Sequence, residues 1–186
     1  MRITGGEFCG RVLKAPADGA LRPTQDRVRE SLFAILAPEM AGADFLDLFA
    51  GSGAVGIEAL SRGAASAAFV ESDPRHLSAA RANLASLAPK ARAQFVRADV
   101  YSWIACYSGP GFSIAFADPP YALGEEKGYA LFLAMLAERG VVRPGGLFAA
   151  EMTAVQRAEE TPGWELLRDR RYGRTRICIW RRAPSR

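Results

Sequence analysis

Histidine and cysteine are scarce in this 186-residue sequence, which contains one His and three Cys. Cys9, Cys106 and Cys178 lie far apart, and no CxxC or Cys/His cluster occurs, so we expect no metal site. Separate cysteines in odd number are typical of a reducing compartment, and we expect a cytoplasmic protein. No apolar run reaches the roughly 18 residues of a transmembrane helix, and the N-terminus lacks the apolar stretch of a signal peptide. We therefore expect no contact with a membrane.

Lysine is also scarce, because only Lys14, Lys90 and Lys127 of the 24 basic residues are lysines. Residues 1–30 carry a net charge of +2 and residues 165–186 a net charge of +6, whereas residues 31–164 carry −4. A genome that favours arginine codons would explain the arginine excess but not this clustering. Arginine's planar fork suits phosphate groups and base edges, so the basic ends favour a nucleic-acid partner.

Short apolar runs alternate with helical patterns along most of the chain. Continuous apolar strands between helices predict a parallel sheet that is covered on both faces. We expect an α/β fold with a doubly wound, mostly parallel seven-stranded sheet, a final antiparallel strand and a small N-terminal hairpin and helix. Residues 1–38 would form this extension and residues 39–186 the main domain. The predicted strands are residues 44–49, 67–70, 94–97, 112–117, 147–152, 164–169 and 175–181. The predicted helices are residues 24–36, 55–62, 74–87, 100–105 and 127–139. Thr24 would cap the first of these helices and Pro38 would end it.

A glycine-rich segment follows the first predicted strand. Gly51, Gly53 and Gly56 form a GxGxxG pattern between a strand and a helix, and Glu71 follows Gly51 by 20 residues at the end of the next strand. Glycines let the backbone approach a ligand closely, and a carboxylate at this spacing can accept hydrogen bonds from both hydroxyls of a ribose. A glycine-rich turn with a surface glutamate is the structural alternative. The pattern favours a cofactor that contains a nucleoside.

Two aspartates refine this prediction. Asp47 lies four residues before Gly51, where its carboxylate would repel a pyrophosphate and attract an ammonium group. S-adenosylmethionine has an ammonium group and no phosphate, so this residue favours it over a dinucleotide. Asp99 ends the third strand and could accept a hydrogen bond from an adenine amino group, although a helix cap is the alternative. The neighbouring Phe49, Ser72 and Val100 complete the candidate cofactor site.

A second segment, Asp118-Pro119-Pro120-Tyr121, follows the fourth predicted strand. The two prolines restrict the backbone and direct carbonyl groups and the Asp118 side chain to one place. Two such acceptors can bind both hydrogens of a planar amine, and the ring of Tyr121 offers a face on which a base can stack. A rigid turn without a catalytic role is the alternative.

The glycine loop, the carboxylates and DPPY resemble the Rossmann-type, S-adenosylmethionine-dependent amino-methyltransferases. The segment LRPTQDRVRESLF, residues 21–33, and the YGRT segment, residues 172–175, are similar to the RsmD family, and the resemblance covers essentially the whole chain. Members of that family methylate a guanine N2 in 16S ribosomal RNA. The resemblance implies that the residues around Asp47, Gly51, Glu71 and Asp99 hold S-adenosylmethionine and that Asp118 to Tyr121 hold the guanine. It also implies that the segment from Arg22 to Arg29 flanks the pocket and contacts RNA or the cofactor, with Arg22, Thr24, Arg27 and Arg29 as the candidate RNA contacts.

Methyl transfer to an amine needs no covalent intermediate and no metal, because positioning supplies much of the acceleration. We expect a monomer that acts on a small-subunit ribosomal particle. Three alternatives remain: a DNA adenine-N6 or cytosine-N4 methyltransferase, a non-catalytic RNA-binding module on the same fold, and an NAD-dependent oxidoreductase. Arg27 and Glu30 could also simply pair on a helix.

Overall fold

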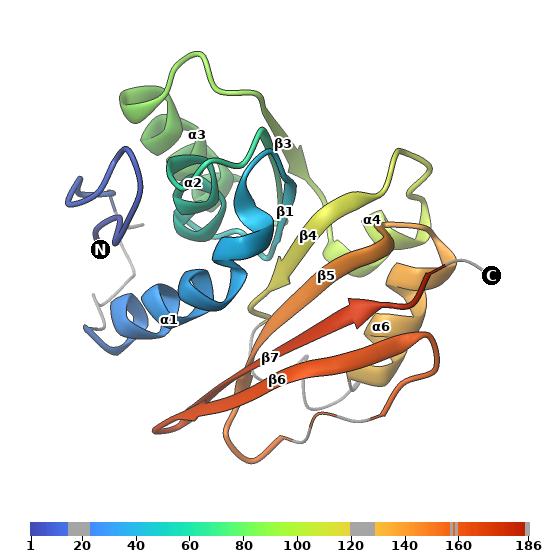
Figure 1. Cartoon of the computed structure of the whole chain (residues 1–186). Helices are drawn as coiled ribbons and strands as arrows, with labels where there is room; N and C mark the ends of the chain where they lie inside the picture. The colour runs from blue at the N-terminus through green and yellow to red at the C-terminus, as the bar shows by residue number, and fades with distance from the viewer. Residues whose placement is uncertain (15–22, 120–128, 157, 159, 185–186) are drawn as a thin grey trace. The chain divides into compact units, whose positions relative to one another are not determined.

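The computed structural model describes residues 1–14, 23–119, 129–156, 158 and 160–184, and Figure 1 shows the order of their helices and strands. The chain divides into two compact units, Met1–Asp99 and Val100–Arg186. The predicted N-terminal extension is part of the first unit, and a separate domain boundary after residue 38 stays a prediction.

The strand order confirms the predicted fold class. Seven strands follow the order β3-β2-β1-β4-β5-β7-β6. Parallel register joins β1 to β2, β2 to β3 and β4 to β5, whereas β7 is antiparallel to both β5 and β6. The sheet is therefore mostly parallel, and its antiparallel part is the C-terminal pair.

Helices and parallel strands alternate in the first unit. Its elements are α1 (Pro23–Met40), β1 (Asp44–Leu48), α2 (Ala54–Ser61), β2 (Ser66–Glu71), α3 (Pro74–Leu87) and β3 (Ala93–Arg97). Because β1 and β2 are almost wholly buried, their apolar sequences DFLDL and SAAFVE match the pattern of strands covered on both faces.

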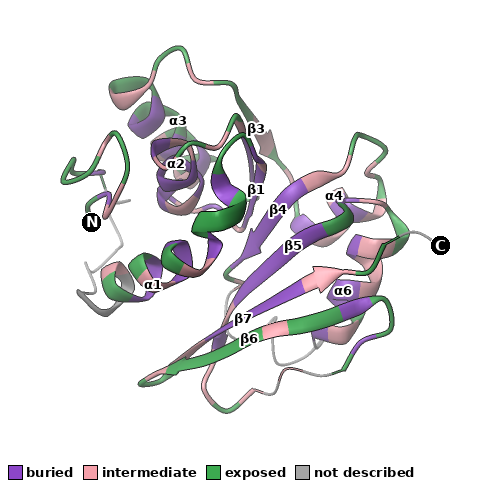
Figure 2. Cartoon of the chain, in the orientation of Figure 1, coloured by how far each residue is buried: buried purple, intermediate pink, exposed green. Residues whose placement is uncertain are grey.

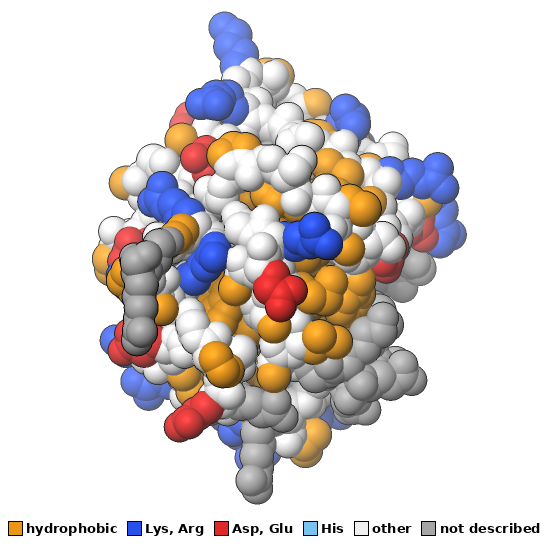
Figure 3. Space-filling view, turned by 90° about the vertical axis from the view of Figure 1, so that its right-hand side faces the viewer, with side chains coloured by type: hydrophobic (Ala, Val, Ile, Leu, Met, Phe, Trp, Pro, Cys, Tyr) orange, Lys and Arg blue, Asp and Glu red, His pale blue; other side chains and the backbone are white. Residues whose placement is uncertain are grey.

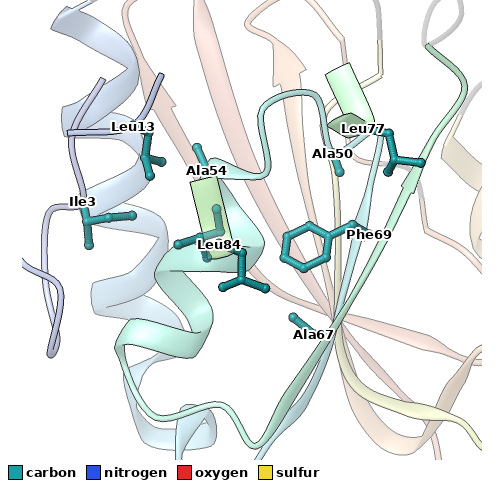
Figure 4. Packing of buried hydrophobic residues seen from close by; sticks show 9 residues of the cluster. Ile3, Leu13, Ala50, Ala54, Ala67, Phe69, Leu77 and Leu84 are labelled. Atoms are coloured by element: carbon teal, nitrogen blue, oxygen red, sulfur yellow. The ribbon is translucent and has the colours of Figure 1, made fainter. Parts of the chain in front are cut away.

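One apolar cluster joins the N-terminal segment to α2, β2 and α3. Figure 4 shows Ile3 and Leu13 packed with Ala54, Phe69 and Leu84 in this cluster. Residues 1–14 meet in a single antiparallel bridge between Arg2 and Val12, so the predicted hairpin is present but very short. The extension is thus anchored by burial of its apolar side chains rather than by a long ladder.

The second unit contains the antiparallel part of the sheet. Its elements are α4 (Val100–Ala105), β4 (Phe112–Ala117), α6 (Tyr129–Glu138), β5 (Val142–Thr153), β6 (Trp164–Tyr172) and β7 (Thr175–Arg182). Figure 2 shows β5 and β7 largely buried and the edge strand β6 largely exposed. The aromatic rings of Tyr129, Phe148, Trp164 and Trp180 pack together against one face.

The structure differs from the sequence prediction at both ends of the first helix and at residues 144–146. Pro38 does not end the first helix, because α1 continues to Met40, which is buried in the core. The helix begins at Pro23 rather than after a cap at Thr24, in keeping with proline's preference for the first helical position. Pro144, Gly145 and Gly146, residues that favour a turn, lie inside β5. Phe112 pairs with Val142 and Ile114 with Leu147, so the extra residues form a bulge.

Candidate functional site

The loop after β1 has a strained backbone. Phe49 has φ +60°, and among the described residues it is the only residue other than glycine with positive φ. Gly51 and Gly53 follow with φ values of +54° and +78°. Left-handed backbone costs about 1–2 kcal/mol for residues with a side chain, so such a residue signals a constrained site. The sequence-predicted glycine loop is therefore a tight turn that leads directly into α2.

Asp47 lies beneath this loop and supports the start of α2. Its carboxylate is 1% exposed, and Oδ2 accepts a hydrogen bond of 2.8 Å from the Gly56 N–H. A Cβ on Gly56 would stand 2.3 Å from the ring of Phe69, so the helix could not approach this closely with any other residue. Asp47 thus has a structural role that the sequence did not predict.

Glu71 joins the glycine loop to the end of β2. Its Oε2 accepts a 2.9 Å hydrogen bond from the Gly51 N–H, and its Oε1 accepts one of 2.9 Å from the Asp73 N–H. The exposed Ser72 places its hydroxyl 3.3 Å from the same Oε1. These contacts hold a nearly buried carboxylate beside the loop, in the place where the sequence predicts ribose recognition.

The arrangement fits a ligand that contains a ribose. A Cβ built on Gly51 would meet no atom within 4 Å, so the space beside this backbone is open. A Cβ on Gly53, in contrast, would come within 2.8 Å of the Cβ of Ala80, which shows that Gly53 serves helix packing. The two glycines have different tasks, and Gly51 is the one that leaves room for a ligand next to Glu71.

Asn83 holds the same loop from the side of α3. Its side chain is 3% exposed and donates to the Ser52 carbonyl at 3.1 Å. It also accepts from the Lys14 N–H at 2.9 Å and donates to the Lys14 carbonyl at 3.0 Å. Sequence reasoning missed this residue. An asparagine in an alanine-rich helix is the signal that could have drawn attention to it.

Asp99 and Val100 stand at the division between the units. Asp99 is exposed, lies two residues beyond β3 and directly precedes α4, and Val100 is buried at the start of that helix. This position is compatible with the helix cap that the sequence left open for Asp99.

The predicted amine-binding segment begins at the end of β4. The strand is buried from Ser113 to Ala117, whereas Asp118 is exposed and Pro119 half-buried. Pro120 and Tyr121 lie outside the described residues. Asp118 therefore places a charged group at the carboxyl end of an otherwise apolar strand.

A buried phenol lies close to this aspartate within the second unit. The Tyr129 hydroxyl donates to the Glu151 carbonyl at 2.9 Å. Burial, followed by the negative charge of Asp118, raises the pKa of Tyr129 far above its ordinary value. Tyr129 therefore keeps its proton and donates this hydrogen bond.

The structure corrects the expected role of Arg29. This side chain is 5% exposed, and its Nε bonds to Glu58 at 2.7 Å while its Nη2 bonds to Asp26 at 3.0 Å and to the Arg2 carbonyl. Arg62 also bonds to Glu58, at 2.9 Å. A guanidinium enclosed in this way cannot reach RNA without breaking a buried ion pair, so Arg29 is a structural residue.

The other predicted RNA contacts are placed only in part. Arg27 is exposed on α1, and the i,i+3 ion pair of this helix joins Arg29 to Asp26. Thr24 lies in the first turn of α1, and its side chain, like the whole of Arg22, is outside the described residues. Figure 3 shows Lys and Arg side chains spread over the face that it draws, without a single basic patch.

The described part of the chain contains no candidate membrane span and no candidate metal site. None of its helices is both long and apolar enough to span a bilayer. Within the same residues, no group of three or more His, Cys, Asp and Glu side chains could hold a metal ion.

The whole chain is similar to known proteins. A family model described as "Conserved hypothetical protein 95" matches residues 1–181. The chain belongs to this family. It is the RsmD family that the sequence motifs indicated.

Curated relatives cover almost the full length of the chain. "Putative rRNA methyltransferase YlbH" of Bacillus subtilis is 38% identical over 185 residues, which are 98% of this chain and 99% of that protein. "Ribosomal RNA small subunit methyltransferase D" of Escherichia coli K12 is 37% identical over 98% of this chain and 90% of that protein. The solved structure of "Putative methyltransferase yhhF" from Escherichia coli has a TM-score of 0.87 and 36% identity, and covers 100% of this chain and 99% of that one.

Proposed function

We propose that this protein transfers a methyl group from S-adenosylmethionine to the exocyclic N2 of a guanine in 16S ribosomal RNA, on a small-subunit ribosomal particle. The observation that carries the proposal is the open backbone at Gly51 held against the carboxylate of Glu71. The family and the names of its members support a methyltransferase that acts on ribosomal RNA. A cytoplasmic monomer is the form we propose.

Residues between β1 and the start of α4 would bind the cofactor. Glu71 would accept hydrogen bonds from the ribose hydroxyls, and Gly51 would let the backbone approach them. Asp47 would favour the ammonium group of the methionine part. When bound, S-adenosylmethionine would supply an electrophilic methyl group on a sulfonium, whose sulfur leaves as a neutral thioether, S-adenosylhomocysteine. The complete set proposed for this site is Asp47, Phe49, Gly51, Gly53, Glu71, Ser72, Asp99 and Val100.

The segment after β4 would hold the target base. Asp118 and the Pro119 carbonyl would accept the two hydrogens of the guanine amine and turn its lone pair outward. The nitrogen gains positive charge as its new bond to carbon forms, so Asp118 stabilises the transition state more than the neutral base. Pro120 would fix the turn, and Tyr121 would offset part of the cost of unstacking the base.

The geometry favours this activity over an oxidoreductase. The buried carboxylate of Asp47, bonded to the first turn of α2, places negative charge beneath the loop where a dinucleotide would place its pyrophosphate. A positively charged sulfonium and ammonium are attracted by that charge, whereas phosphates are repelled.

A transfer assay tests the proposal. The protein is incubated with S-adenosylmethionine that carries a labelled methyl group and with one of three acceptors: unmethylated small-subunit particles, naked 16S RNA or duplex DNA. Label in the particles supports the proposal, label in DNA supports a DNA methyltransferase, and no label with cofactor bound supports a non-catalytic module. Asp118→Ala should reduce turnover by about 10²-fold or more with cofactor affinity unchanged. Glu138→Ala, which removes an exposed carboxylate of α6, is the control.

A further inference from the structure

An exposed group of arginines lies at one end of the β6–β7 hairpin. Arg170, Arg171 and Arg174 are all exposed, around the turn at Gly173. The neighbouring Asp169 has its charge matched by Arg176 at 3.1 Å. The three exposed arginines therefore present a concentrated positive charge, which we call the hairpin tip.

The register places the hairpin tip at the same end of the strands as Asp118, within the second unit. Ala117, the last residue of β4, pairs with Ala150 of β5. β5 then continues for three more residues to Thr153, which pairs with Thr175 of the hairpin. At about 3.3 Å per residue, the hairpin extends about 10 Å beyond the end of β4, on the side where Asp118 begins.

Contacts with the β5–β6 loop fix the tip in this place. The Ala154 N–H donates to the Arg174 carbonyl at 2.9 Å, and Arg176 donates to the Gln156 carbonyl. Arg171 donates through Nε to the Gly173 carbonyl at 2.9 Å and so stiffens the turn. The exposed guanidinium groups are thus carried on an ordered scaffold, which lowers the entropy lost when they bind a partner.

The charged side chains on β6 have a second possible role, because charges on an edge strand block its pairing with another sheet. That use does not require Arg174, which lies in the turn rather than in the strand. The burial of Arg29 also removes one residue from the RNA contacts expected in the N-terminal segment. Both observations favour the C-terminal hairpin over the N-terminal segment as the basic surface that a nucleic acid would contact.

We infer that the hairpin tip binds the phosphate backbone of structured RNA next to the nucleotide that Asp118 receives. This inference rests on the proposed function for the identity of the RNA. Phosphate contacts need no particular base sequence, so they position the RNA while the pocket selects the base.

The test compares two double variants that remove equal charge. Arg170→Ala/Arg174→Ala alters the tip and leaves out Arg171, because Arg171 supports the turn. The control is Arg139→Ala/Arg143→Ala, which removes two exposed arginines. Arg139 directly follows α6 and Arg143 is the second residue of β5, so both lie at the end of the strands that is opposite to the hairpin tip. Binding to 16S RNA and to small-subunit particles is measured at 50–200 mM salt, with a thermal melt of each variant.

Loss of two phosphate contacts should flatten the slope of log K against log salt by about 1.4–1.8 in the tip variant and leave the control unchanged. Cofactor affinity and melting temperature should stay as in the unaltered protein. An unchanged slope in the tip variant overturns the inference, and aggregation with an unchanged slope assigns these arginines to edge protection. If the slope changes but the unaltered protein transfers no methyl group to RNA, the proposed function fails and the RNA surface stands.

Discussion

Glu58 is a fully buried charge in the otherwise apolar helix α2, and its neighbours are arranged around it. Arg29 of α1 and Arg62 both bond to its carboxylate, and the Thr4 hydroxyl donates to it as well. Removing one partner of a buried ion pair leaves an uncompensated charge. The ion pairs of Glu58 and its hydrogen bond with Thr4 therefore fix how α1 and the N-terminal segment dock on α2.

Arg29→Met should lower the free energy of unfolding by about 3 kcal/mol, because Glu58 then keeps only the partly exposed Arg62 as an ionic partner. Arg27→Met, an exposed position on the same helix, should change it by no more than about 0.5 kcal/mol. Urea denaturation measures both. Combining Arg29→Met with Glu58→Leu should recover much of the loss, since the charges that then lose a partner, Asp26 and Arg62, are partly exposed rather than buried. A single Arg29→Met variant as stable as the unaltered protein would show that the ion pair is not needed.

Glu71→Ala should weaken S-adenosylmethionine binding by about 10- to 150-fold, the equivalent of losing charged hydrogen bonds worth about 1.5–3 kcal/mol. Glu71→Gln keeps an acceptor for the Gly51 N–H but removes the charge, so it separates loop support from hydroxyl binding. Calorimetry gives both affinities, with Glu138→Ala as the control. Unchanged affinity in the alanine variant would remove Glu71 from the cofactor site.

Sequence reasoning found the acidic residues at strand ends but not the residues that support them. Asp47 lies near the end of β1, Glu71 ends β2 and Asp118 follows β4, and this local pattern of an acidic residue at the end of an apolar run is visible in the sequence. The roles of Arg29, Glu58 and Asn83 depend on partners from distant segments. Arg29 and Glu58 lie 29 residues apart, and Asn83 bonds to Lys14 across 69 residues. A charged residue that will be buried therefore looks the same in sequence as one that stays exposed.

At the scale of elements, the alternation of strands and helices was predictable because each buried strand is a continuous apolar run. Two irregularities were not. Proline and glycine at 144–146 predict a turn, yet pairing on both sides of this segment extends β5 through a bulge. Pro38 removes one donor, but burial of Met40 retains the last turn of α1. In both places tertiary packing outweighs the local preference of the residue.

The two glycines of the loop should respond differently to alanine. Gly51→Ala meets open space and should cost only the strain of its φ of +54°, about 1–2 kcal/mol, while cofactor affinity falls because the new methyl group occupies the ligand side. Gly53→Ala adds a contact of 2.8 Å with Ala80 and should cost about 2–5 kcal/mol. Denaturation and calorimetry measure the two effects. Equal stability of the two variants would contradict the separate roles of these glycines.

At the scale of the whole molecule, the sequence predicts the net charge of each part of the chain but not which of these charges are exposed. Both ends of the chain are basic, as the sequence shows. The structure places part of the N-terminal charge in a buried ion pair and leaves Arg170, Arg171 and Arg174 exposed at the hairpin tip. Composition records net charge, and only the fold determines which charges a partner can reach.

Cofactor binding should stabilise the folded chain. At a concentration of 100 times Kd, S-adenosylmethionine should add about 2.7 kcal/mol. For a chain of this length, that gain corresponds to a rise in Tm of about 5–10 °C. NAD at the same concentration should leave Tm unchanged, because Asp47 disfavours a pyrophosphate. Differential scanning fluorimetry gives both values, and a rise with NAD alone would favour an oxidoreductase.

The most direct measurement identifies the methylated nucleoside. Unmethylated small-subunit particles are treated with the protein and S-adenosylmethionine, their RNA is digested, and the nucleosides are separated and identified by mass spectrometry. The account predicts N2-methylguanosine with the unaltered protein and at least about 10²-fold less with Asp118→Ala. A methyl group on adenine, on cytosine or on another atom of guanine, or full activity of the Asp118 variant, would contradict it.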